Sequence, residues 1–212
     1  MKVLVETGRV VFLSQCKYVG DGRVVSILNP DVEYQVTPRR RIVDATYTGV
    51  TVPSTTPPAY QVAPEVELVP INALASLDRP PEHFVIVGAG KTGMDAILFL
   101  LSRDIEPEKI SWVISQDAWF LNREEIEPNR LADLMPDQLR ITAISSTPDE
   151  VLLRQEEAGQ IMRLDRDIWP TRYRCATITP ADLKQLQRVE RVIRMGRVTE
   201  INNEEIVLNG GT

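Results

Sequence analysis

Short apolar runs separated by turn residues dominate the first fifty residues of the chain. Valine-rich stretches are divided by Thr7-Gly8 and by Gly20-Asp21-Gly22, which are typical of tight turns between strands. Further extended stretches follow within residues 32 to 47. The pattern predicts a β meander over residues 1 to 50, without a helix to cover it.

A change in composition marks residues 51 to 81 as a connecting segment. Seven prolines fall in this segment, together with Ser54, Thr55 and Thr56. Proline removes a backbone donor and restricts its neighbour, so such a segment does not form a long helix or strand. Within it, residues 66 to 77 predict a short strand and a short helix.

The apolar pattern then predicts a β-α-β unit, which opens a third region, residues 82 to 212. Residues 83 to 90, HFVIVGAG, form a near-continuous apolar run, as expected of a central strand in a parallel sheet. Residues 91 to 104 predict a helix, and residues 108 to 116, EKISWVISQ, predict the second strand.

Further elements are predicted after this unit. Thr147 and Glu150 form a capping-box pattern, and Thr179 before Pro180 is a second helix start. The predicted elements are a broken helix over 123 to 139, a third strand over 140 to 146, helices over 151 to 162 and 180 to 191, and terminal strands joined through Asn202-Asn203.

The glycine cluster Gly88-Ala89-Gly90-Lys91-Thr92-Gly93 is the candidate ligand site. A mononucleotide P-loop would need a further glycine five residues before Gly90, where Val85 stands, so that interpretation fails. The spacing instead fits Gly-x-Gly-x-x-Gly between a strand and a helix. In that motif Gly88 permits a tight turn, Gly90 lets the backbone approach a pyrophosphate, and Gly93 lets helix and strand pack closely.

The amides of the helix N-terminus would face the phosphates, with Lys91 adding a charge and Thr92 a hydroxyl. The competing interpretation is a glycine-rich turn without a ligand. In a dinucleotide fold, the end of the second strand binds the adenosine ribose. Asp117 fits the 2′-hydroxyl of NAD, whereas Ser115, Gln116 and Arg123 fit a 2′-phosphate, which favours NADP slightly.

Residues around this ribose end have two interpretations each. Trp119 and Phe120 either contact adenine or pack beneath the loop. Arg172, Tyr173 and Arg174 lie beside Cys175 and either contact a cofactor anion or form a surface loop, with arginines paired to Asp165 or Asp167.

Composition and charge exclude several classes of protein. A net charge of −6 argues against a nucleic-acid-binding protein, and no apolar run is long enough to span a bilayer. Cys16 and Cys175 are the only cysteines, so neither a disulfide framework nor a thiolate zinc site is expected. Both thiols are expected to pack as small hydrophobes in a reducing cytoplasm. His83, the lone histidine, has no evident partner for acid–base catalysis.

VIVGAGKTGMDA, residues 85 to 96, resembles the nicotinamide-nucleotide motif of flavin-containing monooxygenases and related flavoproteins with two dinucleotide-binding domains. Asp95 occupies the acidic position of that motif. Ala45 and Thr46 resemble the Ala-Thr-Gly that leads out of the flavin domain of these enzymes, although Tyr47 replaces the glycine. The terminal strand pair resembles the pair that closes their nicotinamide domain.

This resemblance implies a Rossmann-like α/β fold and the NAD(P)(H)-binding part of an FAD-dependent oxidoreductase. Residues 1 to 50 would correspond to part of a flavin domain, residues 51 to 81 to the connection and residues 82 to 212 to the NAD(P) domain. The second glycine motif, which binds the FAD pyrophosphate in these enzymes, is missing. The resemblance therefore implies a fragment that does not hold FAD alone and needs a flavin-binding segment or subunit. It names no catalytic residue.

Two other functions remain open. The chain is alternatively a non-catalytic nucleotide-binding or partner-binding module, since it shows no nucleophile and no histidine pair. A free-standing dehydrogenase is a weaker alternative, because Tyr173 is not followed by lysine four residues later. Unpaired strand edges in the β-rich part would favour a homo-oligomer.

Overall fold

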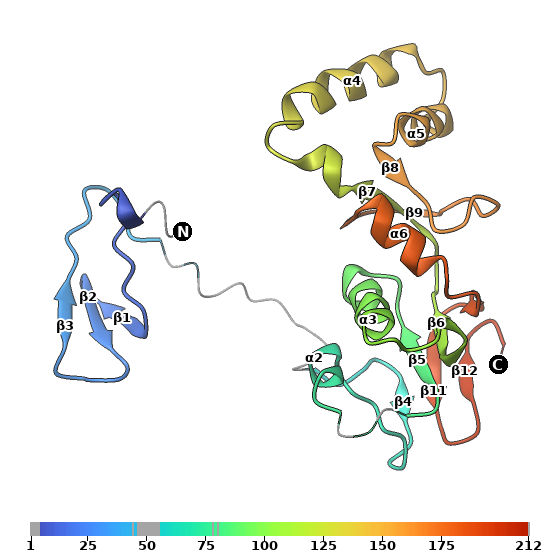
Figure 1. Cartoon of the computed structure of the whole chain (residues 1–212), viewed down its shortest axis with the longest axis horizontal. Coiled ribbons are helices and arrows are strands. Elements are labelled where there is room, and N and C mark those ends of the chain that lie inside the picture. Colours follow the sequence, from blue (N-terminus) through green and yellow to red (C-terminus); the bar gives the residue numbers. More distant parts are fainter. Residues whose placement is uncertain (1–4, 44, 46–55, 78, 80, 212) are drawn as a thin grey trace. The chain divides into compact units, whose positions relative to one another are not determined.

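The structure is a computed structural model that describes residues 5–43, 45, 56–77, 79 and 81–211. The chain divides into two compact units, Met1–Val50 and Thr51–Thr212. Figure 1 follows the elements of each unit along the chain. The predicted mixed α/β class is confirmed: helices accompany several small sheets, one of them wholly parallel, and antiparallel strands lie toward both ends of the sequence.

The first unit contains an antiparallel meander of β1 (Cys16–Gly20), β2 (Arg23–Ser26) and β3 (Glu33–Gln35). The predicted turn at Gly20-Asp21-Gly22 joins β1 to β2. Gly22 has a φ of +77°, and a Cβ there would lie 2.4 Å from the carbonyl oxygen of Val36, so the turn requires glycine. A turn is present at Thr7-Gly8, as predicted, but it is a helical turn and does not join two strands, because the Gly8 amide donates to the Val5 carbonyl oxygen.

The predicted β-α-β unit is confirmed in the second unit of the chain. Its two strands, β5 (Phe84–Val87) and β6 (Ile110–Val113), pair in parallel, and α3 (Lys91–Ser102) connects them, followed by the 3-10 turn η1 (Pro107–Lys109). A third parallel strand, β10 (Val192–Ile193), pairs with the other edge of β6, so the strand order is β10-β6-β5.

The prediction that residues 83 to 90 form a central strand is wrong. β5 lies at the edge of its sheet, and β6 is its only neighbour within the part of the chain that the structure describes. The apolar run has a different cause, because each face of β5 has its own apolar surroundings. Phe84 and Ile86 pack against the core, whereas Val85 and Val87 are 41% and 36% exposed and face a groove.

Two further small sheets complete the second unit. In one of them β7 is central and pairs in parallel with β9 and antiparallel with β8; in the other β11 is central and pairs in parallel with β4 and antiparallel with β12. The strands are β7 (Ala118–Asn122), β8 (Ile161–Met162), β9 (Arg172–Ile178), β4 (Gln61–Val62), β11 (Val198–Ile201) and β12 (Ile206–Leu208). The predicted terminal strand pair through Asn202-Asn203 is therefore confirmed.

The helices differ from the predictions mainly at their ends. Besides α3 and η1, the second unit contains α2 (Ile71–Leu74), the 3-10 turn η2 (Arg123–Ile126), α4 (Leu131–Ile144), α5 (Pro148–Glu157) and α6 (Pro180–Leu186). The predicted strand over 140 to 146 is wrong, because most of it is the end of α4. Ile141 lies two turns after Leu134 on the inward face, and that helical spacing prevails over the β-branched residues.

The helix starts follow the sequence signals. Thr147 accepts a hydrogen bond from the Glu150 amide, and Thr179 with Asp182 forms a reciprocal capping box. The Glu150 carboxylate reaches the Ser146 amide instead of the Thr147 amide, so the first box is only half formed. α5 ends at Glu157, earlier than predicted, because Gly159 takes a φ of +72°.

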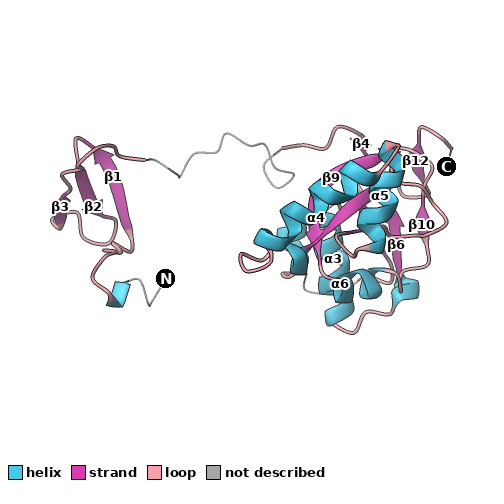
Figure 2. Ribbon diagram, turned by 90° about the horizontal axis from the view of Figure 1, so that it is seen from above, coloured by secondary structure: helices cyan, strands magenta, loops and turns pink. Residues whose placement is uncertain are grey.

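One apolar core joins the parallel sheet to the neighbouring sheet around β7. α3 packs against β5. α6 lies beside α3 (Figure 2). Met94, Ile97 and Leu100 of α3 are buried against Ile110 and Trp112 of β6. The core therefore fixes the junction between β5 and α3, where the glycine cluster lies.

Candidate functional site

The glycine cluster forms the tight turn between β5 and α3. Gly88 has a φ of +116°, which side-chain-bearing residues rarely adopt, so the first glycine of the motif is required by the backbone. The Gly88 amide donates to the carbonyl oxygen of Val113 at 2.9 Å and continues the β5–β6 ladder. The turn therefore starts at a fixed point on the carboxyl edge of the parallel sheet.

Trp112 of β6 also stabilises this turn. Its indole Nε1–H donates to the Gly88 carbonyl oxygen at 2.9 Å, and the side chain is fully buried. Both polar backbone groups of Gly88 are thus fixed by β6. The sequence offered one indication, an aromatic residue in the second strand, but nothing that connected it to the turn.

The other two glycines of the motif have different surroundings. A Cβ at Gly93 would lie 2.4 Å from the carbonyl oxygen of Gly88, so close contact between helix and turn requires glycine there. A Cβ at Gly90 would meet nothing within 4 Å. The space over Gly90 is open, which leaves room for a group to approach the backbone at this point.

The N-terminus of α3 opens onto this space. Gly90 is the N-cap in an extended conformation, and no side chain caps the helix. The first intrahelical bond runs from the Met94 amide to the Gly90 carbonyl oxygen at 3.1 Å. The amides of residues 91 to 93 therefore have no acceptor within the helix, and with the helix dipole they suit an anion.

Lys91 and Thr92 lie in this first turn, as expected. The Lys91 ammonium pairs with the carboxylate of Asp95, one helical turn further on. Thr92 is exposed, and it lines the groove described below. Ala89, between the first two glycines, packs partly against the core. The positive charge of Lys91 therefore lies beside the helix N-terminus, but the Asp95 carboxylate partly neutralises it.

The predicted ribose end, residues 115 to 117, follows β6, which is the strand next to β5. Asp117 pairs there with Arg194. The guanidinium Nε of Arg194 lies 3.0 Å from Asp117 Oδ2, and its Nη2 lies 3.4 Å from Oδ1. Asp117 is only 10% exposed in its side chain. Arg194 follows β10, and the Ile114 amide donates to Ile193, so the pair stands at the same carboxyl edge as the glycine turn. Arg194 was missed, although it follows the apolar pair Val192-Ile193 directly.

Ser115 and Gln116 are exposed at this edge, whereas Arg123 is separated from it. The Gln116 side-chain oxygen accepts a hydrogen bond from the Arg172 guanidinium. Arg123 follows β7, and its Nη2 lies 3.4 Å from the hydroxyl oxygen of Thr177. Six residues of mostly extended chain from Asp117 to Arg123 correspond to roughly 20 Å. Arg172 and Arg194, and not Arg123, are therefore the arginines that the structure brings to the predicted ribose end.

The other singled-out residues are mainly structural. Trp119 and Phe120 are buried in β7, where Trp119 meets Trp169 edge-on. The segment with Tyr173, Arg174 and Cys175 is strand β9 and not a surface loop, and the side chains of Arg174 and Cys175 lie outside what the structure describes. Cys16, which was expected to pack as a small hydrophobe, is only partly buried, and its thiol lies 3.3 Å from the Ser14 carbonyl oxygen.

His83 has a partner that the sequence did not reveal. Its Nε2 lies 2.7 Å from the hydroxyl oxygen of Ser111, which is buried in β6. Thr46 and Tyr47, part of the resemblance to the exit from a flavin domain, lie outside the described residues, and Ala45 is exposed.

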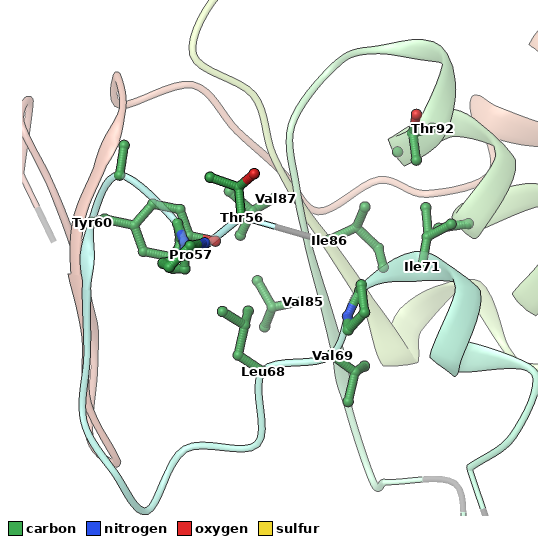
Figure 3. Close-up of a pocket in the computed structure, with 15 residues that line it drawn as sticks. Thr56, Pro57, Tyr60, Leu68, Val69, Ile71, Val85, Ile86, Val87 and Thr92 are labelled. Atoms are coloured by element: carbon green, nitrogen blue, oxygen red, sulfur yellow. The ribbon is translucent and has the colours of Figure 1, made fainter. Parts of the chain in front are cut away.

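A groove of about 640 Å³ runs along β5 beside the glycine turn. Figure 3 shows Val85 and Val87 pointing toward Tyr60 and Pro57 on one side, with Ile71 and Thr92 on the other. None of the lining residues carries a carboxylate, an ammonium or a guanidinium group. Burial raises the pKa of the Tyr60 phenol, which therefore stays neutral at physiological pH. The groove is uncharged, in contrast to the edge around Arg172 and Arg194.

Two general features of the described residues bear on function. None of their helices combines the length and the apolar character needed to cross a bilayer. Nor do their His, Cys, Asp and Glu side chains form a group of three or more that could hold a metal ion.

Comparison with known proteins identifies relatives in mycobacteria. Curated proteins from two strains of Mycobacterium tuberculosis and from Mycobacterium bovis are 39% identical to this chain over 214 residues, and each is described only as an uncharacterized protein. The alignment covers 99% of this chain and 39% of each relative, so the chain spans about two fifths of their length. No family model and no solved structure matches the chain.

Proposed function

We propose that this chain is the NAD(P)(H)-binding part of a flavin-dependent oxidoreductase. The observation that carries the proposal is the turn from Gly88 to Gly93. It combines a left-handed Gly88, an open Gly90 and a crowded Gly93 with an uncapped helix N-terminus at the end of a parallel strand. Each feature has a separate physical reason, and together they fit the requirements of a dinucleotide pyrophosphate.

The proposed fold is Rossmann-like. The order β10-β6-β5, with α3 crossing from β5 to β6, fits one half of a dinucleotide-binding sheet. In such sheets ligands bind outside the carboxyl ends of the strands. The glycine turn, residues 115 to 117 and Arg194 all stand at that edge.

In this proposal the chain binds and orients the cofactor. The amides of residues 91 to 93 donate to the pyrophosphate, the open backbone at Gly90 permits its approach, and the Thr92 hydroxyl adds a donor. Lys91 contributes positive charge once its ammonium turns from Asp95 toward the phosphates. When bound, the reduced nicotinamide supplies a hydride, which a flavin accepts.

The flavin is proposed to belong to another segment or subunit. The resemblance to two-domain flavoproteins supports this, because the chain has one glycine motif where those enzymes have two. The length of the mycobacterial relatives is compatible with it, since most of their sequence lies outside the matched region.

The ribose end favours NADP over NAD. Arg194 neutralises Asp117 and occupies both of its carboxylate oxygens, which disfavours the role of that carboxylate as an acceptor for a 2′-hydroxyl. Arg172 instead supplies a cation that suits a 2′-phosphate, whereas Asp117 and Asp165 offset the charge of Arg194.

Arg172→Gln is expected to weaken NADPH binding about tenfold while changing NADH binding less than about threefold, because one charge-assisted hydrogen bond to the 2′-phosphate is lost. Isothermal titration with both nucleotides measures the two effects. Arg140→Gln, which removes an exposed arginine from α4, is the matched control and should change neither. Equal losses for the two nucleotides would refute the role of Arg172.

Calorimetric titration of the whole chain with NADPH and NADH tests the proposed function. At least one nucleotide is expected to bind with a dissociation constant below about 1 mM. Gly90→Ala is expected to weaken that binding at least about tenfold, because its methyl group would stand where the pyrophosphate approaches. Absence of binding by both nucleotides, or unchanged binding by Gly90→Ala, would contradict the proposal.

A further inference from the structure

Arg194 lies between two carboxylates, and only one of them belongs to the predicted ribose end. Its Nε and Nη2 lie 3.0 and 3.4 Å from the carboxylate oxygens of Asp117. The same Nη2 lies 3.6 Å from Oδ2 of Asp165, which is within the range of an ion pair but too long for a hydrogen bond. Two acids therefore surround one guanidinium, and the group of three carries a net negative charge.

The Asp165 carboxylate is positioned by contacts other than its ion pair. Leu164, the residue before it, is buried in the core, and the Leu164 carbonyl oxygen accepts a hydrogen bond from the Gln187 side chain at 2.9 Å. Asp165 Oδ1 accepts a hydrogen bond from the Asp167 amide at 3.0 Å. These contacts fix Asp165 in the loop between β8 and β9 and leave Oδ2 for Arg194.

Arg163 anchors the same loop to the sheet around β7. Its guanidinium makes two hydrogen bonds to the carboxylate of Glu156, at 2.9 and 2.8 Å, and both side chains are mostly buried. It also lies over the rings of Trp119 and Trp169, 5.3 and 5.7 Å from their centroids. The loop that carries Asp165 is therefore held in place without a contribution from Arg194.

The second arginine at the ribose end has different neighbours. Arg172 is exposed and donates to the side-chain oxygen of Gln116, which is neutral. Its hydrogen-bond partner therefore leaves the guanidinium charge undiminished, whereas the two carboxylates offset the charge of Arg194. A phosphate at this edge is attracted more strongly by Arg172 than by Arg194.

We propose that Asp165 is a specificity-determining residue, which restrains Arg194 and limits the preference of this site for NADP(H). The inference rests on the proposed function, because it concerns the 2′-phosphate of the nucleotide bound there. A guanidinium can donate to several acceptors at once. Without the Asp165 charge, Nη2 of Arg194 would be free to donate to a 2′-phosphate while Nε stays on Asp117. NADH lacks that phosphate, so its affinity should not depend on Asp165.

Calorimetric titration of the whole chain and of Asp165→Asn with NADPH and with NADH provides the test. Asparagine keeps an oxygen that can accept from the Asp167 amide, so it removes the charge and preserves the turn. NADPH binding is expected to tighten about three- to fivefold, the upper range for a partly exposed ion pair, and NADH binding to change less than about twofold. The ratio of the two dissociation constants is the readout, because damage to the fold would weaken both nucleotides alike.

Three further variants test whether Asp165 acts through Arg194. In an Arg194→Gln background, Asp165→Asn should no longer change the ratio, because the residue that it releases is absent. Asp167→Asn removes the same charge two residues further along the loop and should change the ratio less than about twofold. Asp165→Glu keeps a carboxylate and should leave the ratio close to that of the unmodified chain.

The outcomes separate this inference from the proposed function. If NADPH binds and Asp165→Asn leaves the NADPH-to-NADH ratio unchanged, the role of Asp165 is overturned and the proposed function stands. An equal gain in Asp167→Asn, or a gain that persists in the Arg194→Gln background, would also overturn it, since either would reveal a general effect of charge. Absence of binding by both nucleotides in every variant would overturn the proposed function and this inference together.

Discussion

Trp112→Phe is expected to lower the free energy of unfolding of the second unit by about 2–4 kcal/mol. Trp112 is fully buried, and its indole donates to the Gly88 carbonyl oxygen. The smaller ring leaves a cavity in the core and also leaves that carbonyl without its partner. Both losses act at the point where β6 fixes the glycine turn.

Urea unfolding followed by tryptophan fluorescence measures this loss. All three tryptophans lie in the second unit, so Trp119 and Trp169 still report on it in the variant. Trp169→Phe is the matched control, because Trp169 is 40% exposed, and it should cost about 1 kcal/mol or less. Equal losses in the two variants would show that Trp112 has no special role.

Gly93→Val is expected to cost about 3 kcal/mol, at the upper end of the usual penalty for overpacking. The first atom of the new side chain would already lie 2.4 Å from the Gly88 carbonyl oxygen. Because that neighbour is backbone, α3 must move away from the turn to accommodate it. The same movement displaces the amides of residues 91 to 93, so nucleotide binding should be lost as well.

Gly90→Ala is the matched control for stability. A Cβ at Gly90 meets nothing within 4 Å, so this variant should lose at most about 1 kcal/mol, mainly through the weaker N-cap preference of alanine. Thermal and urea unfolding of the two variants should therefore differ clearly. Similar stability of Gly93→Val and the unmodified chain would contradict the close packing of α3 on the turn.

The local elements could be predicted from the sequence because their signals are local. The glycine spacing predicted the β5–α3 turn, and Thr147 and Thr179 predicted two helix starts. Gly20-Asp21-Gly22 predicted the turn between β1 and β2. In each case the backbone needs either a positive φ or an acceptor for a free amide. The residue that supplies it lies at that position or within a few residues of it.

Features set by distant residues could not be predicted. The partner of Asp117 is 77 positions away at Arg194, and the apolar run of β5 does not reveal that its outer face lines a groove with residues 56 to 60 and 68 to 71. Residues 140 to 146 were wrongly predicted as a strand. The inward position of Ile141 depends on how α4 packs, which the sequence does not show. Arg172 reaches Gln116 only through the pairing of β9 with β7.

The turn from Gly88 to Gly93 is proposed to bind the pyrophosphate of a nicotinamide dinucleotide. NMR titration of the labelled chain with NADPH, up to about 1 mM, tests it at the level of single amides. Saturable shifts are expected to concentrate at Gly90, Lys91, Thr92 and Gly93, with weaker shifts near Arg172. Shifts absent from these amides, or confined to other parts of the chain, would contradict it.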